Sequence, residues 1–380
     1  MSTERHEIKM FTPMTLGLLI LIIAGAVSVY KRMTLGLGAT TNLQDDFPWG
    51  FWIGFDVLGG VAMAAGGFVI ASAVYLFNMK KYKPIARPAI LTAFLGYLLA
   101  ASGIFLDIGQ PFRIWHPMVM WQVHSIMFIV AIHVVIYTTV LAMESSPMFF
   151  ERIGLKGVQR FVEKIMMPIA LFGTLLSTLH QSSLGAVYLI VPDKLHPLWY
   201  SSLLPFSFLV SAIMMGLSMV SFESILSSKF FKHQANVGIL SGLARGSMVA
   251  IGFYFVLKIF VLLKGPGIGA AFAGTMEARL YLLEMAVGVI VPLILLLIPA
   301  MRNSTGSIFL VNCLVIVGVV INRMNVAIFG LLRHAHERGA SYFPTTNEFM
   351  VTLFLVALGI FLFKFACKYF NVLSYEEVKQ

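Results

Sequence analysis

Long apolar segments recur along the whole chain and alternate with short stretches of charged residues, proline and glycine. A helix that crosses the apolar part of a bilayer needs about 20 mainly apolar residues. We therefore predict about ten membrane-spanning helices, and the segment 324–346 is long enough to hold a further partial helix. The ten predicted spans lie near residues 13–30, 50–77, 88–109, 118–142, 166–190, 200–223, 240–263, 278–300, 305–323 and 347–370.

The composition leads to the same conclusion. Of the 380 residues, 59% are hydrophobic and 12% are charged. One soluble core could not bury so much apolar surface, whereas helices satisfy their own backbone polar groups inside a bilayer. The chain is therefore predicted to be an all-α integral membrane protein. No polar segment is long enough for a separate soluble domain, so residues 1–380 are predicted to form a single polytopic membrane domain.

The formal net charge of +10 predicts an orientation in the membrane rather than a nucleic-acid partner. Most of the lysine and arginine residues lie in loops between the predicted spans. They are about twice as frequent on the side that contains both termini, and the positive-inside rule places that side in the cytoplasm. Membrane lipid is the expected surrounding, and no nucleic acid is expected to bind.

Several ionisable residues fall inside the predicted spans, where charge is costly and often marks a substrate or proton pathway. At a rise of about 1.5 Å per residue they form two layers. The outer layer contains Asp56, Asp107, His124, Lys258, Glu284 and Arg323. The inner layer contains His133, Glu144, Glu223 and Arg245, and His180 lies midway between the two layers. Pairing between helices is the alternative explanation, mainly for Asp107, Glu144 and Arg323 near predicted span ends. Lys258 is expected to pair with Glu284 or Asp56.

The cysteines and histidines give little support for a metal centre. Cys313 and Cys367 lie in apolar segments without a second cysteine nearby, and the chain has no HExxH sequence. His124 and His133 are separated by about 900° of helical rotation, so they project from opposite faces. One haem between His124 and His180 is the most that the sequence allows, and we expect neither haem nor metal.

A quinone suits these residues better. It needs an apolar cleft for its ring, hydrogen bonds to its two carbonyl oxygens and a route for two protons. The candidate walls are Trp52, Phe55 and Trp121. The candidate catalytic residues, which would bind the carbonyl oxygens and supply protons, are Asp56, His124 and His180.

The inner-layer residues predict a route for protons from the cytoplasm, which would make turnover electrogenic. The predicted proton path contains Glu144, His133, Glu223 and Arg245 at its entry, and Lys258 and Glu284 further along.

Five motifs occur in a distinctive order: DDFPWGFWIGFD at 45–56, KYKPIARPAILTAFLGY at 81–97, DIGQPFRIWHP at 107–117, LHQSSLG at 179–185 and PLWYSSLLPFSFLVSAIMMG at 197–216. Together they resemble the NrfD, or polysulfide-reductase, membrane-subunit family. The chain is most similar to the HybB-type branch, the membrane subunits of periplasmic nickel–iron hydrogenases.

This resemblance implies a haem-free, quinone-reactive anchor in the bacterial inner membrane. The second to fifth and the sixth to ninth spans would form two four-helix bundles, with flanking helices outside them. A ferredoxin-type iron–sulfur subunit would dock on the periplasmic face and exchange electrons with menaquinone. The small and large subunits of a nickel–iron hydrogenase would complete the complex.

The resemblance also implies roles for individual residues. Asp56, His124 and His180 match positions that line the quinone region. Asp107 and Arg113 match an external turn that is structural or faces the partner. Asp45 and Asp46 are expected on the same external side, where they meet the partner or brace the entrance.

One departure leaves other partners open. The HybB-type pattern often has arginine where this chain has Gln110. A different periplasmic cytochrome- or molybdoenzyme-linked quinone oxidoreductase is therefore an alternative. Two further alternatives are a secondary transporter, with a possible helix break in the glycine-rich segment 265–274, and a purely structural anchor with the quinone bound elsewhere.

Overall fold

The computed structural model describes residues 9–231 and 235–373. This part of the chain is built from helices, and it contains no strand beyond an isolated bridge between Gln44 and Phe47. Arg5, Lys232 and Lys379, which contribute to the charge bias of the loops, lie outside the described residues. The predicted all-α membrane fold is confirmed.

Each of the ten predicted spans corresponds to a long helical segment. Within the described residues, nine segments are long and apolar enough to cross a membrane, and two further helices, bent by 58° where they join, make a tenth if they are counted as one span. The nine are Pro13–Leu35, Trp52–Leu76, Lys80–Asp107, Ile126–Ile153, Leu204–Phe230, Val237–Lys264, Met276–Leu297, Thr305–Glu337 and Thr346–Tyr369. The bent pair is Lys156–Lys164 and Met166–Ile190.

Several spans contain more than one helix, because π-helical or 3₁₀ turns join α-helical pieces. The first half of the chain contains α1 (Pro13–Leu35), α2 (Leu37–Thr40), η1 (Trp52–Gly59), α3 (Gly60–Ala64), α4 (Gly66–Ala71), η2 (Ser72–Leu76), η3 (Lys80–Tyr82), α5 (Lys83–Asp107), η4 (Pro111–Arg113), α6 (His116–Val119), α7 (Ile126–Ile153), α8 (Lys156–Lys164), α9 (Met166–Ala186) and η5 (Val187–Ile190). The second half contains α10 (Leu204–Phe230), α11 (Val237–Lys264), α12 (Ile268–Ala271), α13 (Met276–Met285), η6 (Ala286–Ile290), α14 (Val291–Leu297), α15 (Pro299–Arg302), α16 (Thr305–Met324), η7 (Asn325–Phe329), α17 (Gly330–Glu337) and α18 (Thr346–Tyr369).

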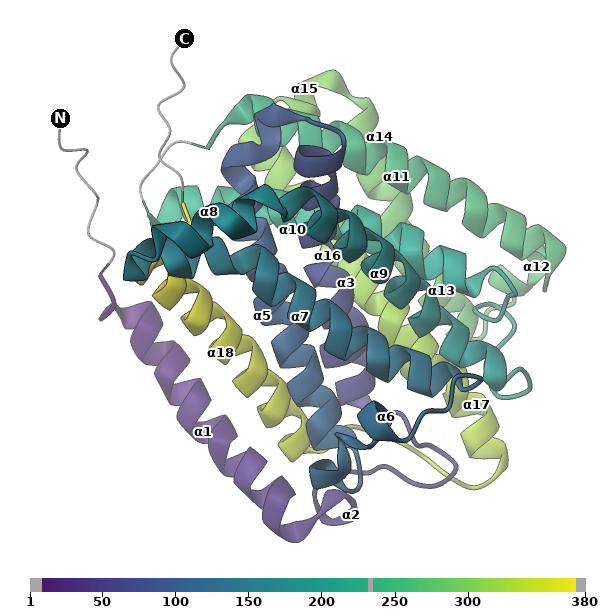
Figure 1. Ribbon diagram of the computed structural model, residues 1–380. Helices are drawn as coiled ribbons and strands as arrows, with labels where there is room; N and C mark the ends of the chain where they lie inside the picture. Colours follow the sequence, from purple (N-terminus) through teal and green to yellow (C-terminus); the bar gives the residue numbers. More distant parts are fainter. Residues whose placement is uncertain (1–8, 232–234, 374–380) are drawn as a thin grey trace.

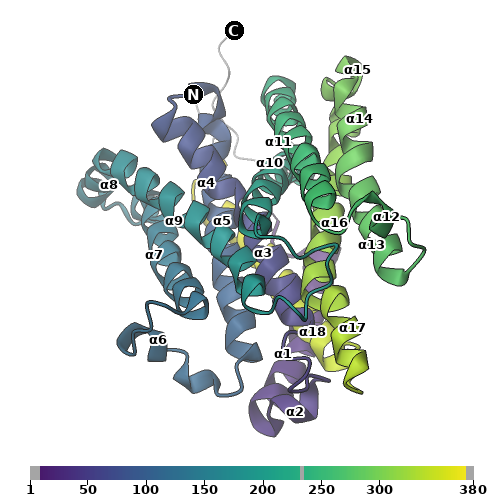
Figure 2. The ribbon, with the colours of Figure 1, turned by 90° about the vertical axis from the view of Figure 1, so that its right-hand side faces the viewer.

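The helices form two bundles and a flanking pair (Figures 1 and 2). In the first bundle, the second span packs with α5, α7 and α9, and in the second bundle α10, α11, the α13–α14 span and α16 pack together. The bundles meet because α10 also contacts α9, α3 and α4. Outside them, α1 and α18 lie side by side and pack against α5. This grouping agrees with the expectation from the family resemblance.

The predicted boundaries of the fourth span are wrong. The helix α7 begins at Ile126 rather than near residue 118, because Ser125 caps it by accepting a hydrogen bond from the amide of Phe128 at 3.4 Å. It continues past residue 142 and ends at Gly154, whose left-handed backbone, with φ of 79°, closes the helix. The charge of Glu144 therefore does not end the helix but lies inside it.

The ninth span is longer than predicted. After α16, the chain continues through η7 into α17, which is the partial helix expected in segment 324–346. Arg323 therefore lies within a continuous span instead of at its end, and it is almost completely buried.

Glycine allows helices to approach closely at two points. A Cβ atom on Gly216 would lie 2.5 Å from the backbone nitrogen of Gly66, so α10 and α4 touch where the bundles meet. In the second bundle, a Cβ on Gly318 would lie only 2.0 Å from the Cα of Gly288. Small residues of this kind bring membrane helices into backbone contact.

Candidate functional site

Asp56 is buried between the second span and two neighbouring helices. Its Oδ2 atom accepts a hydrogen bond of 2.6 Å from the hydroxyl of Thr352 on α18. Its other neighbour is Gly103 on α5, where an added Cβ would lie 3.2 Å from the Cβ of Asp56. The acid therefore occupies a fixed position on the side of α5 that faces α18.

The loop before Asp56 is held by residues of the 342–348 segment. Trp52 donates from Nε1 to the backbone oxygen of Glu348 at 3.0 Å. Tyr342 donates to the carboxylate of Glu348 and accepts from the amide of Phe51 at 2.7 Å. Burial, and then its hydrogen bond to Glu348, raise the pKa of Tyr342, so its hydroxyl stays protonated as a donor.

Sequence reasoning missed the role of Glu348. This residue completes a capping box with Thr345: each side chain accepts a hydrogen bond from the backbone amide of the other residue. The sequence Thr-x-x-Glu before an apolar run is the signal that could have revealed it. No comparable pattern points to Thr352 as the partner of Asp56.

The four residues expected to face a partner differ in exposure. Asp45 and Arg113 are exposed on loops. Asp46 pairs with Arg338, with 2.8 Å between Oδ1 and Nε. Asp107 ends α5, and its Oδ1 atom is buried without a hydrogen bond to any described residue. Asp107 therefore lies at the end of the helix, with one oxygen shielded from solvent.

His180 is completely buried among aromatic side chains of the first bundle. Its ring centroid lies 5.5 Å from that of Tyr97 on α5 and 6.2 Å from that of His133 on α7. Tyr97 also packs edge to face on Tyr137, with centroids 4.7 Å apart. Within the described part of the chain, neither ring nitrogen of His180 makes a hydrogen bond.

The predicted position of His133 in the cytoplasmic layer is wrong. Because α7 begins at Ile126, His133 lies only about 10 Å from the N-terminal end of the helix, in the half of the span opposite to the one predicted. It contacts His180 there. The error came from placing the whole span too far towards the N-terminus.

Glu144 extends the same polar region towards the C-terminal end of α7. It lies on the face of α7 that also contains Tyr137 and His133. A Cβ on Gly173 of α9 would lie 3.3 Å from Glu144 Oε1 and 3.6 Å from the ring of Tyr137. Glu144 is buried, and its Oε2 atom has no hydrogen-bond partner among the described residues.

We use the name polar column for six residues on α5, α7 and α9: Tyr97, His133, Tyr137, Glu144, Ser177 and His180. The hydroxyls of Tyr97, Tyr137 and Ser177 are buried as well, and the two tyrosine hydroxyls approach Ser177 without reaching good hydrogen-bond geometry, while the ring nitrogens of His180 have no partner among the described residues. Buried polar groups are usually paired, so unpaired groups collected in one place indicate a site for water or a ligand.

His124 and Trp121 do not join this region. His124 lies in an exposed turn before α7, so its predicted depth inside a helix is wrong. Trp121 is 70% exposed and donates to the backbone oxygen of Met118 at 3.0 Å. Both residues precede Ser125, which caps the start of α7. Phe55 stays on the second span, half-buried and stacked on Phe51 with ring centroids 5.7 Å apart.

The remaining inner-layer residues lie apart from Glu144. Glu223 on α10 accepts a hydrogen bond of 2.6 Å from Thr92 on α5. Arg245 lies on an exposed face of α11. The structure therefore does not gather the predicted entry residues around one point.

The second bundle contains its own buried network around Glu284. Lys258 pairs with Glu284 Oε1 at 2.9 Å, which confirms one of the two expected pairings. Trp199 donates to Glu284 Oε2 at 3.0 Å, and further donors are the amides of Asn322 at 3.1 Å and Asn325 at 2.7 Å. Sequence reasoning missed these three residues, since polar amides and tryptophan are not conspicuous in a membrane helix.

Arg323 joins this network through Asn322. Its guanidinium donates to Asn322 Oδ1 and to the Ser211 hydroxyl, each at 2.8 Å. It also lies 3.8 Å from the ring centroid of Phe208. Arg323 is thus held by α10 and is not an interfacial residue.

Comparison with known proteins links the chain to one family. The family model described as "Polysulphide reductase, NrfD" matches residues 39–335. A protein of Nitratidesulfovibrio vulgaris is 38% identical over 375 residues, covering 96% of this chain and 95% of the relative. The probable Ni/Fe-hydrogenase 2 b-type cytochrome subunit of Escherichia coli is 32% identical over 345 residues, covering 90% and 87%. The integral membrane subunit of menaquinone reductase from N. vulgaris is 28% identical over 380 residues, covering 93% and 89%.

Proposed function

This chain belongs to the NrfD polysulphide reductase family, and from that premise we propose that it transfers electrons between an iron–sulfur partner and menaquinone. Its relatives include membrane subunits of a hydrogenase and of menaquinone-linked oxidoreductase complexes. The observation that carries the proposal is the buried imidazole of His180, which has neighbouring hydroxyl groups but no hydrogen-bond partner among the described residues.

The polar column has the chemistry that a quinone requires. Reduction of a quinone takes up two electrons and two protons, and each carbonyl oxygen needs a hydrogen-bond donor. Leaving a buried polar group unpaired costs about 1–3 kcal/mol, which a bound carbonyl would recover. His180 and Tyr97 are therefore the proposed contacts of one carbonyl group, with the surrounding aromatic rings as apolar walls.

Protons would reach this point from the cytoplasmic side along the column. Glu144 lies about 16 Å from His133 along α7, and Tyr137 and Ser177 lie between these depths. The hydroxyl groups and intervening water could relay protons over that distance. Asp56 lies on another face of α5 and would supply a proton from the side of α18.

The partner would dock on the outer loops. Asp45 and Arg113 are exposed there, and Phe112, Trp115 and Trp121 present apolar surface on the segment between α5 and α7. The name of the E. coli relative supports a nickel–iron hydrogenase as the partner. The small and large subunits of that hydrogenase would complete the proposed complex. Another cytochrome- or molybdoenzyme-linked complex is the alternative.

We also propose that the subunit is haem-free, although the name of the E. coli relative includes a b-type cytochrome. His180 is completely buried and its ring packs against Tyr97 with centroids 5.5 Å apart, so the side chains of α5, α7 and α9 would have to move apart to admit a porphyrin. The absorption spectrum of the purified chain tests this point. A reduced-minus-oxidised band of haem b would contradict it.

The proposed function is tested by comparing His180→Gln with His336→Gln in membranes that contain the assembled complex. Glutamine keeps a polar side chain but does not exchange a proton, so quinone-linked turnover in His180→Gln should fall at least about 100-fold, the contribution of one general acid–base group. His336 is exposed on α17, and its replacement should leave turnover unchanged.

Electron transfer from the partner to a soluble dye is the control for assembly, and it should be normal in both variants. Normal quinone turnover in His180→Gln would instead support a structural anchor. Transport of a solute by the isolated chain, without redox partners, would support a secondary transporter.

A further inference from the structure

The network around Glu284 contains more positive than negative charge. Lys258 and Arg323 are both buried, and one hydrogen-bonded network connects them through Glu284 and Asn322. Within the described residues, neither cation forms an ion pair with any other acid. An unbalanced charge inside a membrane protein is costly, so a second negative group is expected near these cations.

Glu284 cannot balance both cations. Its two carboxylate oxygens already accept four hydrogen bonds, from Lys258, Asn322, Trp199 and Asn325. These contacts occupy the space around the carboxylate. Because Glu284 carries a single negative charge, one of the two positive charges is left without a counterion.

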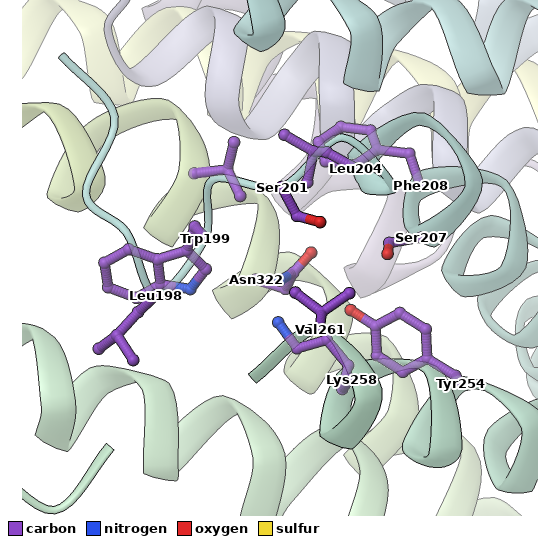
Figure 3. A pocket seen from close by; sticks show the side chains of 11 residues that line it. Leu198, Trp199, Ser201, Leu204, Ser207, Phe208, Tyr254, Lys258, Val261 and Asn322 are labelled. Carbon is purple, nitrogen blue, oxygen red and sulfur yellow. The ribbon is translucent and has the colours of Figure 1, made fainter. Parts of the chain in front are cut away.

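A small cavity adjoins Lys258 between α10, α11 and the loop before α10. Figure 3 shows the ammonium group of Lys258 and the hydroxyls of Tyr254 and Ser207 around this space. Neither hydroxyl hydrogen-bonds to a described residue, and only one of the three ammonium donors of Lys258 is used, in its bond to Glu284. Leucine and valine side chains form much of the remaining wall. Three unused sources of hydrogen bonds therefore surround a mostly apolar space.

The size and the donors of the cavity define its ligand. It has room for about one water molecule, and a chloride ion is only slightly larger than water. A metal cation would be repelled by Lys258, and a phosphate or carboxylate would be too large. A neutral water molecule would satisfy the donors but would leave the excess charge.

We propose that this cavity binds a halide-sized anion, which is chloride under ordinary ionic conditions. The anion accepts hydrogen bonds from Lys258, Tyr254 and Ser207 and neutralises the network. It also ties α10 to α11 beneath the loop that carries Trp199. This site is independent of the quinone proposal, which concerns the first bundle.

The direct test is a crystal structure of the full chain, alone or in its complex, grown in sodium bromide. Anomalous scattering at the bromine edge should give a peak between Lys258 Nζ, the Tyr254 hydroxyl and the Ser207 hydroxyl. A cavity without an anomalous peak, or with density that fits only water, would overturn the proposal.

A solution test compares thermal unfolding in chloride and in gluconate at constant ionic strength. Chloride should raise the unfolding temperature of the wild type in a saturable manner, whereas gluconate is too large to enter. Tyr254→Phe and Ser207→Ala should each weaken the apparent affinity for chloride at least about tenfold, because each removes a hydrogen bond to a charged group.

Tyr281→Phe is the matched control. The ring of Tyr281 lies 4.7 Å from Lys258 Nζ, but its hydroxyl does not line the cavity. The control should therefore bind chloride like the wild type. The proposal would be refuted if Tyr254→Phe bound chloride with wild-type affinity. It would also be refuted if chloride and gluconate changed the unfolding temperature of the wild type equally. If a variant fails to fold, the bromide experiment decides.

Discussion

Asp56 and His180 lie against different faces of α5. Asp56 lies beside Gly103, whereas His180 packs on Tyr97. Six residues separate these two contacts, which places them about 120° apart around the helix. The residues expected to form one site are therefore divided by α5, and we assign Asp56 to proton supply rather than to direct contact with the same carbonyl as His180.

Asp56→Asn tests that assignment. Asparagine can keep the hydrogen bond with Thr352 but cannot carry a proton, so quinone-linked turnover of the complex should fall at least about tenfold while thermal stability stays close to the wild type. The control is Asp193→Asn, since Asp193 is exposed on a loop. Full turnover in Asp56→Asn would show that this carboxylate carries no required proton.

Glu144→Gln tests the inner end of the polar column. The amide keeps the shape of the side chain but removes the exchangeable proton, so proton uptake from the cytoplasmic side of vesicles should fall during quinone turnover. Glu151→Gln is the control, because Glu151 forms a partly exposed ion pair with Arg87, with 3.1 Å between the charged atoms. An unchanged ratio of protons to electrons in Glu144→Gln would exclude the column as the path.

At the scale of helices, π-helical turns coincide with the buried polar residues. Asp56 lies within η1, and Asn325 opens η7. Glu284 lies just before η6. The wider turn changes the direction of the side chains that follow it, and such turns are frequent at functional sites. The runs of apolar residues that predict the spans do not show where the helix pitch changes locally.

Gly318→Ala tests the contact between α16 and η6. The added methyl group would lie 2.0 Å from the Cα of Gly288, so the helices would have to separate, at a cost of about 1–3 kcal/mol in stability. In Gly17→Ala, the new Cβ would meet no atom within 4 Å beyond the adjoining backbone of its own helix, and stability should be unchanged or slightly higher. Equal unfolding midpoints for the two variants in a detergent titration would contradict the close packing.

At the scale of the whole molecule, the two bundles have different polar interiors. The first contains unpaired polar groups in the polar column, whereas Glu284 in the second is fully hydrogen-bonded. α10 connects them through its contacts with α9 and α4. The two proposals therefore concern different bundles: we propose quinone chemistry in the first bundle and anion binding in the second.

The orientation in the membrane is tested by single cysteines on opposite sides. We expect Arg113→Cys to react with an impermeant thiol reagent from the periplasmic side, because Arg113 lies on an exposed outer loop. Lys229→Cys, exposed at the other end of the molecule, should react only after the membrane is permeabilised. The chain without either substitution measures the background from Cys313 and Cys367. The reverse pattern of labelling would place the termini in the periplasm.

The sequence by itself determined the number of spans, the all-α membrane class and the family. These conclusions depend on properties that are local in the chain: the length of an apolar run, the absence of long polar segments and the order of short motifs. The pairing of Lys258 with Glu284 was also among the predictions, because two isolated opposite charges inside a membrane have few other partners.

Only the tertiary structure decided which polar residues meet. Because α7 begins at Ile126, His133 packs against His180, and His124 lies in an exposed turn before the helix. An error of eight residues in a helix start shifts a side chain by about 12 Å, and each residue turns it by about 100°. The prediction that a span exists tolerates such errors, because most positions of a span are apolar. The contacts of a buried polar group do not, because they depend on the depth and rotation of every helix around it.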